Sequence, residues 1–130
     1  QGQAAPVEDA FRDLRIIKMT APKCHAKSAL GDTVTLKYSG WIKEEYPGGR
    51  MFDSTDSHKK PFKRVLRSGQ MVKGFLHGVL NMCQGEKRLL EIPPQLAYGK
   101  KGAGNVIPPD SILVFQVELV SIDDKGPIEL

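Results

Sequence analysis

The stretch MVKGFLHGVL, residues 71–80, decides the fold class because it is the one segment with a clear helical pattern. Its apolar residues recur at the three- and four-residue spacing of a single buried stripe: Val72, Phe75, Leu76, Val79 and Leu80. Gly74 and Gly78 weaken this helix by about 1 kcal/mol each relative to alanine. Gly85 stands where a C-terminal cap is expected. The sequence therefore predicts one short helix with one buried face.

Segments with the two-residue period of β-strands lie on both sides of that helix. They cover residues 13–19, 34–38, 62–66, 87–93 and 112–122. In the last and longest segment, one face carries Leu113, Phe115, Val117 and Leu119. The strands do not alternate with further helices, which excludes a sheet built from βαβ units. We expect an α+β fold, in which a curved antiparallel sheet of five to six strands wraps around one short helix.

The length of 130 residues is that of one domain, and 40% hydrophobic with 26% charged residues excludes a disordered chain. We expect a domain over 14–123, an N-terminal tail over 1–13 and a C-terminal tail over 124–130. No apolar run approaches the roughly 18 residues of a membrane helix, so no membrane span is expected. The chain begins with Gln1 and not with methionine, which indicates removal of a signal peptide or trimming of the chain.

The formal net charge of +4 permits nucleic-acid binding only if the basic residues cluster. They are densest between residues 58 and 67, where apolar residues and Pro61 interrupt them. This pattern favours the solvated face of a strand and its preceding loop over a phosphate-binding patch. Lys87 and Arg88 are expected to be ordinary solvated side chains. We expect no nucleic-acid partner.

Motifs for nucleophilic, metal-dependent and phosphoryl-transfer chemistry are absent. The three histidines, His25, His58 and His77, are scattered and are expected at the surface. Asp53 and Asp56 lack the twelve-residue calcium loop and indicate a turn. We expect neither a metal nor a cofactor.

Cys24 and Cys83 are the only cysteines, and no second cysteine or histidine pair completes a metal site around them. They form either one disulfide or two buried thiols, and their spacing alone leaves both alternatives open. If they pair, the closed loop of about 60 residues contributes about 4 kcal/mol in the chain-entropy model.

Five ordered stretches carry a resemblance to a known family. They are VTLKYSG (34–40), MFDSTDSHKKPF (51–62), GQMVKGF (69–75), MCQGEKRLLEIP (82–93) and LAYGKKGAGNVIPPDSILVF (96–115). In this order and spacing the chain resembles the FKBP-type peptidyl-prolyl cis–trans isomerases, the immunophilins that bind tacrolimus and rapamycin. The resemblance covers residues 31–123. It implies a monomeric enzyme that accelerates rotation about Xaa-Pro bonds, with proline-containing polypeptides and macrolide inhibitors as partners.

The resemblance also implies a pocket and the roles of its residues. The catalytic positions are Tyr98, Asp53 and Tyr38, and the substrate-binding positions are Phe52, Phe62, Met71, Val72, Phe75, Ile107 and Phe115. The Tyr98 hydroxyl and the Ile107 backbone N–H are expected to donate to a ligand carbonyl, and Asp53 to orient toward Tyr38. Pro108 and Pro109 disfavour a helical backbone at the residues before them. The loop is therefore expected to form an extended flap.

Each pocket position also has a plainer interpretation. Val72, Phe75 and Phe115 would be core residues in any fold, and Asp53 would normally form a turn. Only their ordered combination makes them candidates for a site. A weakly active binding or chaperone-like module on the same scaffold is the alternative function.

Three positions depart from the pattern of the family. Phe75 stands where a tryptophan is usual, His58 where many members have arginine, and Ala103 where histidine or an aromatic residue is usual. The connection over residues 44–50 is also longer. These departures predict slower turnover or weaker macrolide binding than in strong members of the family.

The resemblance bears on the cysteines as well. Secretory-pathway members often carry one cysteine in the N-terminal loop and another in a Met-Cys-x-Gly-Glu-Lys-Arg stretch, as Cys24 and Cys83 do here. This implies a disulfide and the lumen of the endoplasmic reticulum. The terminal residues 127–130 agree with the retention signal Lys-Asp-Glu-Leu at two positions.

Overall fold

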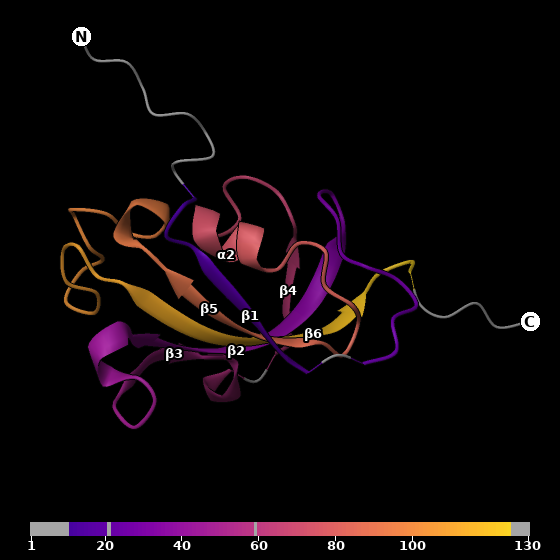
Figure 1. Cartoon of the computed structure of the whole chain (residues 1–130), viewed down its shortest axis with the longest axis horizontal. Helices are drawn as coiled ribbons and strands as arrows, with labels where there is room; N and C mark the ends of the chain where they lie inside the picture. The colour runs from indigo at the N-terminus through magenta and orange to yellow at the C-terminus, as the bar shows by residue number, and fades with distance from the viewer. Residues whose placement is uncertain (1–10, 21, 59, 126–130) are drawn as a thin grey trace, which may run out of the picture.

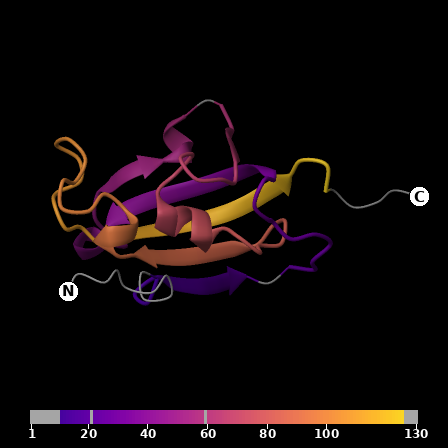
Figure 2. The ribbon, with the colours of Figure 1, turned by 90° about the horizontal axis from the view of Figure 1, so that it is seen from above.

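A six-stranded antiparallel sheet curves beneath one short helix in the computed structural model, which describes residues 11–20, 22–58 and 60–125 (Figures 1 and 2). The strands are β1 (Arg15–Thr20), β2 (Thr33–Ile42), β3 (Met51–Ser54), β4 (Phe62–Val65), β5 (Lys87–Ile92) and β6 (Leu113–Ile122), and the helix is α2 (Lys73–Gly78). The sheet order is β1-β5-β6-β2-β3, and β4 pairs with the first half of β2 while β3 pairs with the second half. The predicted α+β fold is confirmed.

The core lies between the sheet and α2. The alternation in β2 and β6 turns one set of side chains toward the helix: Val34, Leu36, Leu113, Phe115, Val117 and Leu119 are all buried. From the helix, Phe75 and Leu76 complete the core, as the apolar stripe predicts. Gly78 lets α2 pack closely on β5, because a Cβ there would lie 2.5 Å from the end of the Leu90 side chain.

Two details of the predicted secondary structure were wrong. The helix ends at Gly78, so Gly85 does not cap it; Gly85 has a φ of +86° in the turn that leads into β5. Strand β3 was also missed, because Asp53 looked like a turn residue. Asp53 lies in β3, and only Asp56 lies in a turn, the 3₁₀ segment Thr55–Ser57.

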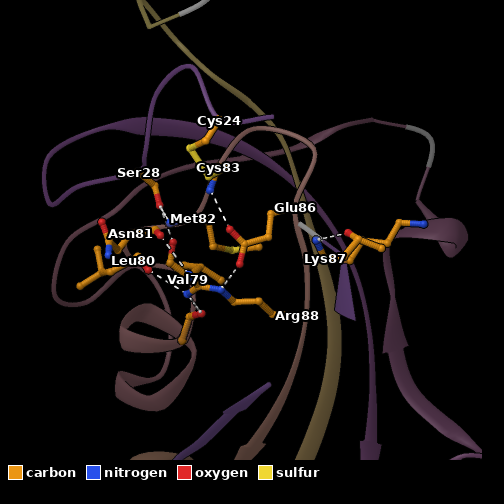
Figure 3. A network of polar contacts seen from close by, with 12 residues as sticks. Cys24, Ser28, Val79, Leu80, Asn81, Met82, Cys83, Glu86, Lys87 and Arg88 are labelled. Atoms are coloured by element: carbon orange, nitrogen blue, oxygen red, sulfur yellow. Dashed lines mark hydrogen bonds and ion pairs between the residues drawn. A yellow bond between two sulfur atoms is a disulfide. The ribbon is translucent and has the colours of Figure 1, made fainter. Parts of the chain in front are cut away.

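Of the two charges predicted to be solvated, Lys87 is exposed but Arg88 forms a buried ion pair (Figure 3). Arg88 is 5% exposed and Glu86 1% exposed, and the Arg88 Nε donates to a Glu86 carboxylate oxygen at 2.6 Å. The other Glu86 oxygen accepts the Cys83 N–H at 2.9 Å. The Arg88 guanidinium donates to three carbonyl oxygens at the end of α2 and just beyond it, those of Gly78, Leu80 and Asn81. Arg88 thus satisfies carbonyls that a helix end leaves without partners.

The same region holds a disulfide, which resolves the two alternatives for the cysteines. Cys24 and Cys83 are bonded, with their Cα atoms 5.2 Å apart. Nearby, the buried Ser28 hydroxyl donates to the Val79 carbonyl at 2.6 Å and accepts the Met82 N–H at 2.9 Å. The segment before β2 is therefore fastened to the turn that follows α2 (Figure 3).

Within the described part of the chain, no helix has the length and apolar character needed to cross a bilayer. Among the same residues, no three histidine, cysteine, aspartate or glutamate side chains come together as a metal site would require. The three histidines are exposed, and the His77 ring lies 4.2 Å from that of Phe11, a residue assigned to the N-terminal tail. The retention-like residues 127–130 lie outside the described residues.

Candidate active site: an aromatic cavity between sheet and helix

A cavity of about 180 Å³ opens between α2 and the inner face of the sheet. Its walls come from β2, β3, β4, β6, the start of α2 and the loop after β5. The lining residues are Tyr38, Phe52, Asp53, Phe62, Arg64, Gln70, Met71, Val72, Phe75, Tyr98 and Phe115. The structure thus brings together every site residue named from the sequence except Ile107.

Five aromatic rings in this lining pack edge to face. Tyr38 meets Phe62, Phe75 and Phe115 with ring centroids 5.1, 5.4 and 5.8 Å apart. Phe115 in turn meets Phe52 at 5.5 Å and Phe75 at 5.0 Å. Edge-to-face pairs of this kind stabilise one another beyond their buried area. The rings therefore hold a fixed apolar wall.

Gly40 in β2 lies directly behind two of these rings. A Cβ at this position would be 2.7 Å from the Phe115 ring and 2.8 Å from the Phe52 ring. Such contacts are too close for any side chain, so the two rings can lie against the strand only because residue 40 is glycine.

The hydroxyl of Tyr38 is tied to Asp53. It donates to the Asp53 Oδ2 at 2.7 Å, while the Asp53 Oδ1 accepts the Ser54 N–H at 2.9 Å and lies 3.3 Å from the His58 Nε2. Burial and the interaction with the Asp53 carboxylate raise the pKa of the Tyr38 phenol above its ordinary value. Tyr38 therefore stays protonated and orients the carboxylate. His58 supplies the contact with Asp53 although many members of the family have arginine at this position.

Tyr98 is the polar group at the mouth of the cavity. Its side chain is 40% exposed, and its hydroxyl forms no hydrogen bond with the described residues. This hydroxyl is therefore free to donate to a bound ligand.

Ile107 does not take the place that the sequence prediction gave it. It is 4% exposed and does not line the cavity. Its N–H donates to the Ala103 carbonyl at 3.1 Å, and the Ala103 N–H donates back at 2.8 Å. The Ile107 N–H is therefore engaged within its own loop, and this geometry does not support its expected donation to a ligand carbonyl.

A backbone donor is available elsewhere in the lining. Val72 immediately precedes α2, and its N–H has no partner among the described residues, as is usual for the first N–H groups of a helix. The resemblance implies a substrate-binding position at Val72 without naming its N–H as a donor.

Arg64 and Gln70 were missed by the sequence prediction. The Arg64 guanidinium carbon lies 4.3 Å from the centroid of the Phe62 ring. Period-two alternation places Phe62 and Arg64 on the same face of β4, and that pattern could have revealed Arg64. Arg64 is exposed, as the interpretation of this basic stretch as solvated predicts, and its side chain also borders the cavity.

Comparison with known proteins identifies the class. Residues 24–120 match the family model of FKBP-type peptidyl-prolyl cis-trans isomerases, so the chain belongs to this family of enzymes. It is 48% identical over 112 residues to FK506-binding protein 2 of Yarrowia lipolytica, covering 85% of this chain and 75% of the relative. It is 39% identical over 126 residues to peptidyl-prolyl cis-trans isomerase FKBP2 of Mus musculus, covering 96% of this chain and 87% of the relative.

A solved structure agrees with the fold. The crystal structure of AtFKBP13 superposes with a TM-score of 0.73 at 29% sequence identity, covering 83% of this chain and 91% of that chain. The family, the fold class and the assignment as an isomerase, all predicted from the sequence, are confirmed.

Proposed function

We propose that the aromatic cavity is where this isomerase binds and rotates Xaa-Pro bonds of unfolded or flexible polypeptides. The observation that carries the proposal is the wall of five mutually packed rings beside the unpartnered Tyr98 hydroxyl. Residues 14–123 form the isomerase domain in this proposal, with the tails outside it.

The chemistry needs no acid, base or nucleophile. Rotation breaks amide resonance, against a barrier of about 18–20 kcal/mol. The planar amide is stabilised by charge separation between its oxygen and nitrogen, which water supports and an apolar cavity supports less. A cavity that fits the twisted amide better than the planar one lowers the barrier, because only such differential binding accelerates the step.

The residue roles follow from the donors and rings available. Tyr98 donates its hydroxyl to a carbonyl of the bound peptide, and the Val72 N–H replaces Ile107 as the backbone donor. Asp53, held by Tyr38, presents a carboxylate beside the bound amide. The apolar residues Phe52, Phe62, Met71, Phe75 and Phe115 enclose the proline ring.

Tyr98→Phe tests this assignment. We expect a fall of about tenfold in kcat/KM on Xaa-Pro peptides, the equivalent of about 1.4 kcal/mol and of one hydrogen bond. Tyr46→Phe is the matched control, since the Tyr46 hydroxyl accepts a bond from Gln116 and does not line the cavity. An inactive wild-type protein would refute the function, and an unchanged Tyr98→Phe would refute the role of the hydroxyl.

Tacrolimus and rapamycin are proposed as competitive ligands of the same cavity. The alternative function, a weakly active binding or chaperone-like module, is favoured by Phe75, a smaller ring where the resemblance predicts tryptophan. A protease-coupled assay with and without rapamycin distinguishes the two. An isomerase must show turnover that rapamycin abolishes. A binding module must bind the peptide without appreciable turnover.

We further propose that the protein works as a monomer in the lumen of the endoplasmic reticulum. The disulfide between Cys24 and Cys83 supports an oxidising compartment. Intact mass after alkylation without reductant tests the pairing in the native protein, and two alkylated cysteines would contradict it. A sedimentation mass above 14.4 kDa would contradict the monomer.

A further inference from the structure

One cationic side chain lies in the lining of the cavity, that of Arg64. Its guanidinium lies over the Phe62 ring, which stabilises it by a cation–π interaction and holds it at the edge of the aromatic wall. Its one hydrogen bond with the described residues joins Nη1 to the carbonyl of Lys63 at 2.9 Å. Because a guanidinium has five N–H donors, most of them remain available.

No carboxylate of the described residues neutralises Arg64. Asp53 is the one acidic residue in the lining, and its oxygens are engaged by the Tyr38 hydroxyl, the Ser54 N–H and His58. On the opposite face of β4, Lys63 pairs with Asp123 at 3.1 Å. Arg64 is therefore a solvent-exposed cation in the lining of the cavity that forms no ion pair with the described residues.

Two side chains near Arg64, those of Gln70 and Lys73, would also favour a bound anion. Gln70 lines the same cavity, and its side-chain amide forms no hydrogen bond with the described residues. A neighbouring hollow, lined by Lys73 among others, shares Met71 and Val72 with the cavity. A peptide that passes from one to the other meets two cations, and complementary charge at such sites gives specificity.

We propose that Arg64 is a specificity-determining residue, which selects Xaa-Pro substrates with an acidic side chain next to the proline. The inference rests on the proposed function and names its substrate class. A guanidinium binds a carboxylate through two parallel hydrogen bonds. Its position over Phe62 reduces the entropy lost when it does so.

Exchange NMR on matched peptides tests the inference. One pair carries Glu or Gln directly before the proline, and a second pair carries Glu or Gln directly after it. At low ionic strength we expect kcat/KM to be about threefold to fivefold higher for the Glu peptide of at least one pair, the range of a partly exposed ion pair. Because salt screens such a pair, the ratio should fall toward one at about 0.5 M NaCl.

Three variants separate charge from packing. Arg64→Gln should bring the Glu-to-Gln ratio to about one, and Arg64→Lys, which retains the charge but not the planar fork, should keep part of it. Lys63→Gln is the matched control, because it removes one positive charge from the outer face of the same strand, and it should keep the full ratio.

The outcomes are distinct. A ratio of one for the wild-type protein in both pairs, or a ratio that survives Arg64→Gln, would overturn the role of Arg64 while leaving the isomerase function intact. Absence of turnover on every peptide, Gln peptides included, would overturn the proposed function and this inference with it.

Discussion

The polar groups at the two ends of helix α2 differ: those at one end are hydrogen-bonded, and those at the other have no partners in the described part of the chain. At the C-terminal end, Arg88 donates to the free carbonyls and to the buried Glu86 carboxylate, and the disulfide lies nearby (Figure 3). At the N-terminal end, the Val72 N–H and the Tyr98 hydroxyl have no partners among the described residues. Within the described structure, polar groups are thus paired at the end of α2 away from the cavity and left without partners at the end where we propose that the substrate binds.

Arg88→Gln should have the largest effect, because it leaves the Glu86 carboxylate buried without its partner. We expect a loss of about 3–5 kcal/mol in the free energy of unfolding, measured with urea. Lys87→Gln is the control, since Lys87 lies on the exposed face of the same strand. If the two variants lose the same stability, the buried pair does not stabilise this end of the helix.

Replacing both Cys24 and Cys83 with serine removes the covalent link at the same end. A loop with a sequence separation of 59 residues should cost about 2–4 kcal/mol when opened. The measurement is the melting temperature of the double variant beside that of the wild type with and without reductant. A reductant that leaves the wild-type melting temperature unchanged would contradict this prediction.

At the cavity end, Asp53→Ala should mainly reduce activity. It leaves the half-buried Tyr38 hydroxyl without its acceptor, and we expect about a tenfold fall in kcat/KM with about 1 kcal/mol of lost stability. Asp56→Ala, three residues away in the exposed turn, makes the same change outside the cavity. Equal activities of the two variants would show that the carboxylate of Asp53 has no special role.

Phe75→Trp tests the cavity end of the helix by placing a larger ring at the floor of the cavity. The larger ring should raise tacrolimus affinity by about threefold through added apolar contact. Isothermal titration of both proteins measures the difference. No gain in the variant would argue against the interpretation that Phe75 limits binding.

The smallest expected effect is a dependence of stability on pH. Burial alone would raise the pKa of Glu86, but the Cys83 N–H and Arg88 outweigh it, so the pKa lies below its ordinary value of 4.5. A depressed pKa means that Glu86 contributes stability above pH 4.5, and that this contribution is lost as the pH falls further. The stability difference between wild type and Glu86→Gln should therefore shrink with acidification in urea melts. A constant difference would contradict this.

The sequence predicts well what periodicity controls. The stripe through Phe75 and Leu76 and the alternation through Phe115 and Val117 locate the core, and the resemblance to the family supplies the remaining cavity residues. What it could not predict depends on contacts between distant segments. Arg88 is buried only because Glu86 and three carbonyls surround it, and the Ile107 N–H is engaged only because its loop closes on Ala103.

Gly40 affects the size of the cavity as well as the packing of the sheet. It does not line the cavity, yet the absence of a side chain there lets Phe115 and Phe52 lie against β2. A single methyl group added behind them would push both rings forward and narrow the recess from its rear. The volume of the cavity is thus limited partly by residue 40, which lies behind its wall, and engineering of a wider or tighter cavity would begin there.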